Sequence, residues 1–479
     1  MRKSCLSILL IIIYSYSFSQ SKSFDIHKKY SVVQIFQDID YTEKYLTKFH
    51  PDPFKYISQD SLHAFILSLK SRIDSPLTEM QIRFYIKQII AKIGCGHNDA
   101  GASKHYAKTI AKTNRPIIPL NTFITDSNHL YILNNLSKDS SIKAGDEILS
   151  INNHSTQSIL HTIFSVSTSD GYNITYKKQG ARYQWFKYYY SFCYGFKSSY
   201  NISIKHKNQT ITNYNLPSIS SLKDTIIFPK KDSVHYINTT KTCHYSILQN
   251  NKPIAIIDID GFKGRHWYSF FRKTFRDIKR KNIEHLVIDL RDNGGGQIND
   301  GLNVLSYLIH KKTYLPFDRK PNLMMLNPKY KMNIGSRITP FIFCTMMPQW
   351  PKNKRLRHYF IALPKRKNAY HGNMYVLVNG KSFSMSGVVA SYLKYQAHAI
   401  IIGEETGGNV AGSNAVISGK IILPNTRIQV FIPMYHIYHD IEVKNDGHGL
   451  IPDYPTQYSK DDILNGVDID LIKVSSLVN

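Results

Sequence analysis

Apolar residues recur every three or four positions between residues 24 and 93, which is the spacing that places them on one face of an α-helix. The pattern is clear in SVVQIFQDIDYTEKYLTKF, SLHAFILSLKSRI and EMQIRFYIKQIIAKI. Breaks at Asp52-Pro53 and at Asp74-Ser75-Pro76 divide the stretch, so it predicts two or three helices. The pattern stops at GCGHND (94–99), where two glycines permit an unusual backbone path around His97.

Apolar and polar positions alternate between residues 117 and 216, which is typical of β-strands. The alternation runs through NTFITDSNHLYIL, GDEILSINNHSTQSIL, YQWFKYYYSFCYGF and SYNISIKH. We expect the tyrosine-rich segment 183–195 to pack between strands, the alternative being that it lines a peptide groove. A polar stretch at 217–251 then reads as a linker.

From residue 252 onward, strand and helix patterns take turns. The apolar runs PIAIIDID, HLVIDL, MYVLVN and AIIIG read as strands, and WYSFFRKTFRDIKRK, INDGLNVLSYLIH and MSGVVASYLKYQ read as helices. This order predicts parallel βαβ units with right-handed crossovers. Ligands of such sheets bind beyond the carboxyl ends of the strands.

Three unusual turns fall at that edge of the predicted sheet: RDNGGG, NGKSFSMSG and GEETGGN. A serine between a strand and a helix places its hydroxyl near unpaired backbone N–H groups, which suits a nucleophile, although Ser382, Ser384 and Ser386 could also be simple caps. The glycine turn could be a tight connection, or it could direct amide N–H groups at an oxyanion. Three such turns on one edge favour function.

The ordered motifs DLRDNGGG, VLVNGKSFSMSG and IIIGEETGGNVAG resemble the catalytic core of the serine peptidase family that includes C-terminal processing (tail-specific) proteases and the tricorn core. Residues 142–152 (IKAGDEILSIN) resemble the core of a PDZ domain, and GLIPDY at 449–454 fits the same family. The resemblance implies an α/β protein, α+β overall, with a crotonase-like ββα core, an N-terminal helical domain and a PDZ-like β domain. It also implies peptide-bond hydrolysis through an acyl-enzyme without a metal or an organic cofactor.

Carried over by position, the resemblance makes Ser384 the nucleophile and the N–H groups of Met385 and Gly295 the oxyanion donors. Asn409 stands where the processing proteases have a lysine base, so the sequence is closer to the tricorn-like branch, which uses a histidine from an N-terminal segment. His97 is the matching residue. An imidazole titrates near neutrality, so it can accept the serine proton and later return it.

The group that orients His97 is open at this stage. Asp446 and Asp99 are candidates, although each could equally be a solvated loop carboxylate, and a backbone carbonyl could serve instead. Asn409 could contact the substrate or the nucleophile loop. His436, His439 and His448 do not have the spacing of a compact zinc motif, so we expect exposed polar histidines and no metal site. These three lie in a loop-rich stretch.

The composition and the N-terminus limit the class of protein and its location. The 479 residues are 42% hydrophobic, which is enough for folded domains. The first 20 residues read as a signal peptide and predict export to the periplasm or the medium, and no later stretch is apolar enough for a membrane span.

We expect a helical domain (21–100), a PDZ-like domain (101–216), a linker (217–251) and a peptidase core (252–479). The four cysteines left after cleavage show no CxxC spacing.

The net charge of +27 is unevenly spread, since an insertion at 311–370 holds 14 Lys and Arg residues against one acid. We expect this basic insertion to cover the catalytic edge as a lid or rim that favours acidic substrates or peptide carboxyl termini. An exported serine peptidase is therefore the leading function. A catalytically silent peptide-binding protein with the same fold is the main alternative. A basic protein of the envelope that binds polyanions is a weaker one, and nucleic acid is not an expected partner, because no recognition motif is present.

Overall fold

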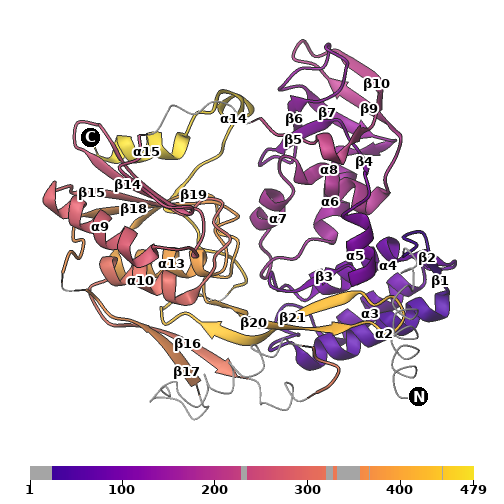
Figure 1. Cartoon of the computed structure of the whole chain (residues 1–479), viewed down its shortest axis with the longest axis horizontal. Helices are drawn as coiled ribbons and strands as arrows, with labels where there is room; N and C mark the ends of the chain where they lie inside the picture. The colour runs from indigo at the N-terminus through magenta and orange to yellow at the C-terminus, as the bar shows by residue number, and fades with distance from the viewer. Residues whose placement is uncertain are drawn as a thin grey trace, which may run out of the picture.

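The computed structural model describes residues 24–227, 235–319, 327–331, 357–365, 367–444 and 446–478. The predicted signal peptide and most of the basic insertion lie outside these residues. Three parts pack together: N-terminal helices, a small antiparallel sheet with its own helices, and a C-terminal α/β part (Figure 1).

The N-terminal part holds three helices where the apolar periodicity predicts them: α2 (Val32–Phe49), α3 (Gln59–Lys70) and α4 (Glu79–Lys92). A short ladder pairs β1 (Lys29–Tyr30), just before α2, with β2 (Leu77–Thr78), just before α4. Buried Asp38 on α2 accepts hydrogen bonds from the backbone N–H and the hydroxyl of Thr426. These bonds dock the helices onto the C-terminal part, with which they share one hydrophobic core.

The second part is an antiparallel sheet in the order β10-β9-β7-β6-β5, with β8 paired to β7. It has a separate apolar core. Its strands are β5 (Leu120–Ile124), β6 (Leu130–Asn135), β7 (Glu147–Ile151), β8 (His154–Ser155), β9 (Ser199–Lys205) and β10 (Ile211–Pro217). The accompanying helices are α6 (Thr156–Ser165), α7 (Thr175–Gly180) and α8 (Trp185–Tyr194).

The tyrosine-rich segment is helix α8, so the prediction of strand alternation there was wrong, although its side chains do pack against the small sheet. Its aromatic residues favour strands intrinsically, but packing overrides that preference. Phe186 and Tyr190, four positions apart, both point into the core of the small sheet, which requires helical spacing.

The C-terminal part is built on a seven-stranded mixed sheet in the order β12-β13-β14-β15-β18-β19-β22. Strands β14 (Ile254–Ile259), β15 (His285–Asp289), β18 (Asn373–Val378), β19 (Ile400–Gly403) and β22 (Tyr454–Pro455) run parallel, while β12 (Asn238–Thr239) and β13 (Cys243–Leu248) are antiparallel. Alternate residues of β15 enter different cores: Leu286 and Ile288 face one, and Val287 faces the other. Helices α9 (Trp267–Arg280), α10 (Ile298–Leu308) and α13 (Met385–Ala397) cover the first face, and α15 (Ile469–Val478) covers the second (Figure 1).

A further sheet joins the N- and C-terminal parts. Its order is β17-β16-β21-β20, and β3 (Asp99–Gly101) pairs with the start of β21 (Gln429–Tyr438). The other strands are β16 (Thr313–Arg319), β17 (Arg357–Ala362) and β20 (Gly412–Ile422). This pairing places the turn that contains His97 close to the C-terminal sheet.

The described ends of the basic insertion lie against the far end of α13. The Thr313 hydroxyl bonds Gln396, and the Tyr392 hydroxyl donates to the carbonyl of Tyr314. Because α13 begins beside Ser384, these contacts lie at the opposite end of that helix. They give no support to the expectation that the insertion covers the catalytic edge.

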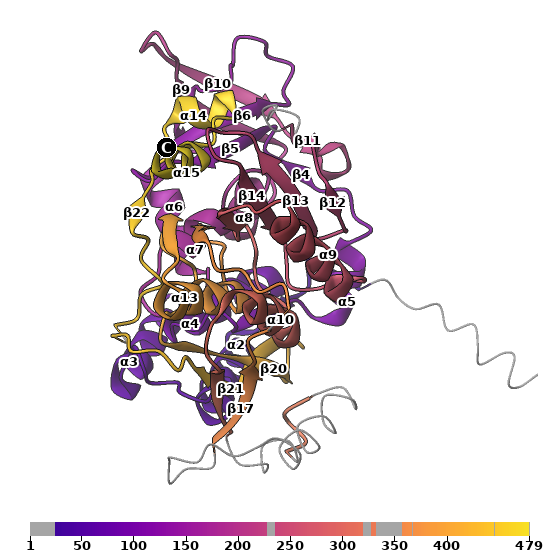
Figure 2. The ribbon, with the colours of Figure 1, turned by 90° about the vertical axis from the view of Figure 1, so that its left-hand side faces the viewer.

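The C-terminal segment bridges two parts. Helix α14 (Lys460–Asn465) lies beside the small sheet (Figure 2), where the Lys460 ammonium sits over the ring of Tyr131. Within the described ranges, no helix is both long and apolar enough to cross a bilayer.

Candidate active site

Ser384 occupies a strained turn between β18 and α13. Its backbone has φ 56° and ψ −122°, which is a conformation that non-glycine residues rarely adopt and that costs on the order of 1–3 kcal/mol. Such strain holds a nucleophilic hydroxyl out from a strand–helix junction in other hydrolases. The neighbouring serines differ: the buried Ser382 hydroxyl donates to the carbonyl of Leu290, and the hydroxyl of Ser386 is buried in the helix.

His97 lies directly against this turn. Its Nε2 is 3.2 Å from the Oγ of Ser384. The Phe383 ring packs on the imidazole with a centroid separation of 4.6 Å, and the Tyr176 ring packs on Phe383 at 4.5 Å. The histidine therefore has a fixed orientation, and its accessible nitrogen faces the serine hydroxyl.

Burial lowers the pKa of His97, and the nearby charge of Asp170 opposes this effect by raising it. The net direction is downward, so the imidazole is neutral at neutral pH. A neutral imidazole can accept a proton, which is the state that a general base requires.

Asp170 is the carboxylate whose charge raises the pKa of His97, and no sequence pattern points to it. It is 3% exposed, and it accepts hydrogen bonds from the N–H groups of Gly96 at 2.7 Å and Asn409 at 3.4 Å. Burial raises its pKa, while His97 and these N–H groups lower it. In the sequence it appears only as part of a Ser-Asp-Gly turn, far from every motif.

The candidate orienting residues lie elsewhere. Asp446 is exposed and accepts from the N–H of His448 in its own loop. Asp99 is exposed and pairs with Lys87. Asn409 is buried, and its side-chain amide donates to the Tyr56 hydroxyl at 2.6 Å. The structure therefore brings together His97 and Ser384, and Asp170 is the carboxylate whose charge acts on the pKa of His97.

Gly295 approaches the serine closely. With φ at +100°, its Cα is placed so that an added Cβ would lie 2.7 Å from the Cβ of Ser384 and 2.9 Å from the N of Met385. Its N–H donates to the side-chain oxygen of Asn293 at 2.8 Å. Met385 is the first residue of α13, a position where a helix leaves the backbone N–H without an intrahelical partner. In this conformation Met385 is thus the better placed oxyanion donor.

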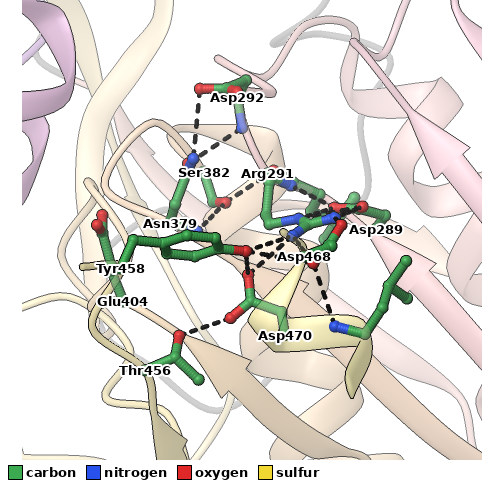
Figure 3. Close-up of polar contacts among 12 residues, drawn as sticks. Asp289, Arg291, Asp292, Asn379, Ser382, Glu404, Thr456, Tyr458, Asp468 and Asp470 are labelled. Carbon is green, nitrogen blue, oxygen red and sulfur yellow. Dashed lines mark hydrogen bonds and ion pairs between the residues drawn. The ribbon is translucent and has the colours of Figure 1, made fainter. Parts of the chain in front are cut away.

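An ionic cluster anchors the strand that leads into the glycine turn (Figure 3). The guanidinium of Arg291 bonds Asp289 at 2.6 Å and both Asp468 and Asp470 at 2.8 Å, and it also reaches the Tyr458 hydroxyl at 3.1 Å. These partners come from β15 and from the C-terminal segment. Beside the cluster, the Asn379 amide bonds Asp292, which ties the glycine turn to the serine turn.

Two pockets meet at the serine turn, and both are lined by Asp292 and Lys381. The first, of about 440 Å³, contains His97 and Asn98, and also Lys87, Lys177 and Asp99. The second, of about 660 Å³, extends past the Arg291 cluster and has an acidic lining. Its charged residues are Asp258, Asp260, Asp289, Asp292, Glu404, Asp462, Asp468 and Asp470, with Arg182, Arg291 and Lys381.

Of the three histidines near the C-terminus, His436 and His439 are not exposed as expected, whereas the side chain of His448 is 46% exposed. His436 lies in β21, where its Nδ1 meets the Asn414 side chain at 2.8 Å, and burial lowers the pKa of His439 to about 4. The expectation failed because a strand passes through a stretch that reads as loop. Over the described ranges, no group of three or more His, Cys, Asp and Glu side chains could hold a metal ion.

A strained serine at a strand–helix junction, a partly buried neutral histidine at hydrogen-bonding distance and a nearby carboxylate are the groups that serine hydrolases use. Residues 253–456 match the model of peptidase family S41. Over these residues the chain is similar to the S41 serine peptidases. None of the curated proteins matches the sequence.

Three solved structures are compared with the chain. Mature CPAF in complex with lactacystin is 15% identical, with a TM-score of 0.66, and the match covers 93% of this chain and 98% of that one. The photosystem II D1 C-terminal processing protease is 12% identical, with a TM-score of 0.43, over 92% and 96% of the two chains. The tricorn protease is 13% identical, with a TM-score of 0.34, over 93% of this chain and 36% of its own. Of these three, the structure of mature CPAF is the one whose TM-score shows a shared fold, so the chain is nearer to CPAF than to the tricorn protease.

Proposed function

We propose that this chain is an exported serine peptidase in which Ser384 attacks the peptide carbonyl and His97 is the general base. The observation that carries the proposal is the 3.2 Å contact between His97 Nε2 and Ser384 Oγ, made at a strained strand–helix turn. Neither residue needs to move to exchange a proton.

The reaction follows from this geometry. The Ser384 hydroxyl gives its proton to His97 Nε2 as its oxygen bonds to the carbonyl carbon, and the resulting oxyanion accepts a hydrogen bond from the Met385 N–H. The imidazolium then protonates the leaving amine, and the C–N bond breaks to leave an acyl-enzyme. Water attacks the ester, again with His97 as base, and releases Ser384. Asp170 lowers the cost of the imidazolium by its charge.

A second oxyanion donor would be Gly295, as the resemblance implies. Its N–H is bonded to Asn293 in this structure. We therefore propose that the Gly295 N–H joins the oxyanion site only when the turn shifts on substrate binding, whereas Met385 needs no such change.

We propose that the small sheet is a PDZ-like module that binds or gates the substrate. In support, Tyr176 on its helix α7 packs on Phe383, next to the nucleophile. Export is inferred from residues 1–20 alone, and determination of the N-terminus of the protein recovered from the medium or periplasm would test it.

We also propose that substrates are proteins or peptides, with acidic residues or a free carboxyl terminus held beside His97. Lys381 and Lys177 line the pocket there and support this preference. The neighbouring pocket is acidic instead, so the preference belongs to one side of the cleavage site only.

Hydrolysis of a protein such as casein, followed by mass spectrometry of the products, tests the function. We expect cleavage by the wild type and none by Ser384→Ala. The matched control is Ser391→Ala, which removes a buried hydroxyl of the same helix farther from the turn. If folded wild type binds peptides but cleaves none, the silent peptide-binding alternative is correct.

A further inference from the structure

Three aromatic rings contact one another in series at the nucleophile turn, and we call them the ring stack. The ring of Phe383 packs on the imidazole of His97 with a centroid separation of 4.6 Å, and the ring of Tyr176 packs on Phe383 at 4.5 Å. Phe383 directly precedes Ser384 and is only 5% exposed. The three rings come from three parts of the protein: the turn after α4, the turn between β18 and α13, and helix α7.

Two glycines leave room for the ring stack. A Cβ added at Gly96 would lie 2.7 Å from the Cζ of Phe383, and one added at Gly407 would lie 2.7 Å from the Cδ2 of Tyr176. Neither glycine has a positive φ, so packing and not backbone conformation explains why a glycine stands at each position. A larger residue at either position would displace a ring.

Tyr176 is the contribution of the small sheet to the ring stack. The small sheet has an apolar core of its own, separate from the one that the other parts share. Polar contacts dock the start of α7 instead: the Thr175 hydroxyl donates to the carbonyl of Glu405, and the Asn173 side-chain amide donates to the carbonyl of Thr406, each at 2.9 Å. This docking sets the position of Tyr176, which reaches His97 through Phe383.

The ring stack affects both the placement and the protonation of His97. Its Nε2 must stay near 3.2 Å from the Ser384 hydroxyl, and a misplacement of about 1 Å can cost on the order of 100-fold in rate. Burial is also the main cause that lowers the pKa of His97. Without the Tyr176 ring, Phe383 would be free to tilt away from the imidazole, and water would enter beside it.

We propose that Tyr176 is a positioning residue for the proposed general base, because its ring holds Phe383 against His97. The base is then aligned with the serine only while helix α7 is docked. This inference rests on the proposed peptidase function and gives the proposed gating by the small sheet a physical route. A shift of α7 would change catalysis through the ring stack.

The test compares Tyr176→Ala with Tyr176→Phe, which keeps the ring. We expect Tyr176→Ala to lower kcat for a fluorogenic peptide about 10- to 100-fold. The acid limb of kcat/KM should move to higher pH, because water beside His97 weakens the burial that lowers its pKa. Tyr176→Phe should stay within twofold of the wild type and keep its acid limb. Gly407→Ala, which pushes on the tyrosine ring, should change both quantities in the same direction as Tyr176→Ala.

A second readout does not need turnover. The pH dependence of the modification of His97 by diethyl pyrocarbonate, followed by mass spectrometry of the peptide that contains it, gives the pKa of the imidazole. Tyr176→Ala should raise this pKa, and Tyr176→Phe should not. Tyr172→Ala is the matched control, since this tyrosine of the same segment is 62% exposed and its ring packs on Tyr56 and not on Phe383. It should change neither the pKa nor kcat by more than a small amount.

The inference is overturned if Tyr176→Ala keeps both kcat within twofold and the pKa of His97. A rise in KM alone would also overturn it, because Tyr176 lines the catalytic pocket and would then contact only the substrate. Equal losses in Tyr176→Ala and Tyr176→Phe would assign the effect to the hydroxyl and overturn it as well. If the folded wild type cleaves no peptide while the pKa of His97 still depends on the Tyr176 ring, the peptidase function fails and the ring stack stands.

Discussion

His97 Nε2 lies 3.2 Å from Ser384 Oγ although 287 positions separate the two residues in the chain. Two features of the fold close this distance. Pairing of β3 with β21 brings the histidine turn to the C-terminal part, and the strained serine turn projects the hydroxyl toward it. The proposed base and the proposed nucleophile thus come from segments far apart in the chain.

Removal of the base should nearly abolish turnover. We expect His97→Ala to lower kcat by about 10⁴-fold or more, since serine and base act as a unit. Asn409→Ala should retain activity that still depends on His97, because the Asn409 side chain bonds Tyr56 and its backbone N–H, which faces Asp170, is kept. Steady-state kinetics on one peptide measure both variants. Activity of His97→Ala near the wild-type level would refute the assignment of the base.

Asp170 should control the pH dependence. The activity requires neutral His97, whose pKa burial already lowers, so the acid limb of kcat/KM is expected below the ordinary histidine value of about 6.5. The Asp170 charge raises that pKa, so Asp170→Asn should move the acid limb to still lower pH while reducing the maximal rate roughly 10- to 1,000-fold. Asp446→Asn, a change to an exposed carboxylate, is the control and should move neither quantity. A shift of the Asp170→Asn profile toward higher pH would contradict this role.

We expect that no residue larger than glycine is tolerated at position 295. An added Cβ would meet Ser384 and the carbonyl oxygen of Phe383 at 2.7 and 2.8 Å, and the residue has φ +100°. We expect Gly295→Ala to lower kcat by about 100-fold or more, as expected for loss of oxyanion-site geometry. Gly387→Ala is the control, because its Cβ would meet only the Ser382 carbonyl at an ordinary 3.8 Å. Equal activity of the two variants would show that the close approach has no catalytic consequence.

The Arg291 cluster should stabilise the fold around the glycine turn. Its guanidinium is the shared partner of Asp289, Asp468 and Asp470, so Arg291→Met leaves these carboxylates together without it. Removal of one partner from a buried ionic cluster costs about 3–5 kcal/mol. Denaturant unfolding measures this loss, with the exposed Arg280→Met as control. A change below about 1 kcal/mol would mean that the cluster is solvated and contributes little.

We expect Lys381, and not Lys365 of the basic insertion, to determine the preference for acidic substrates. Lys381 lines both pockets, whereas Lys365 of the insertion places its ammonium over the ring of Tyr307 on α10. We expect Lys381→Gln to raise KM for acidic peptides relative to neutral ones, and Lys365→Gln to have no such effect. The opposite result would restore the expectation that the insertion forms the rim of the site.

Sequence patterns located the strands and helices of the C-terminal sheet because strict apolar periodicity and turn motifs agree there. They failed at α8, where aromatic residues with strand preference pack as a helix, and at His436, which is buried in a strand. Ser384 and His97 could be proposed from the sequence because each stands in a distinctive turn, and the structure brings the two together. Asp170 could not be proposed, because its proximity to His97 depends on burial and on neighbours distant in the chain. Contacts between residues distant in the chain leave no pattern in the local sequence.

Labelling with a fluorophosphonate probe, followed by mapping of the modified peptide by mass spectrometry, tests the central claim most directly. Wild type should be labelled at Ser384, slowly in His97→Ala, and not at all in Ser384→Ala. Folded wild-type protein that is not labelled, or that is labelled at another serine, would contradict the assignment of Ser384 as the nucleophile.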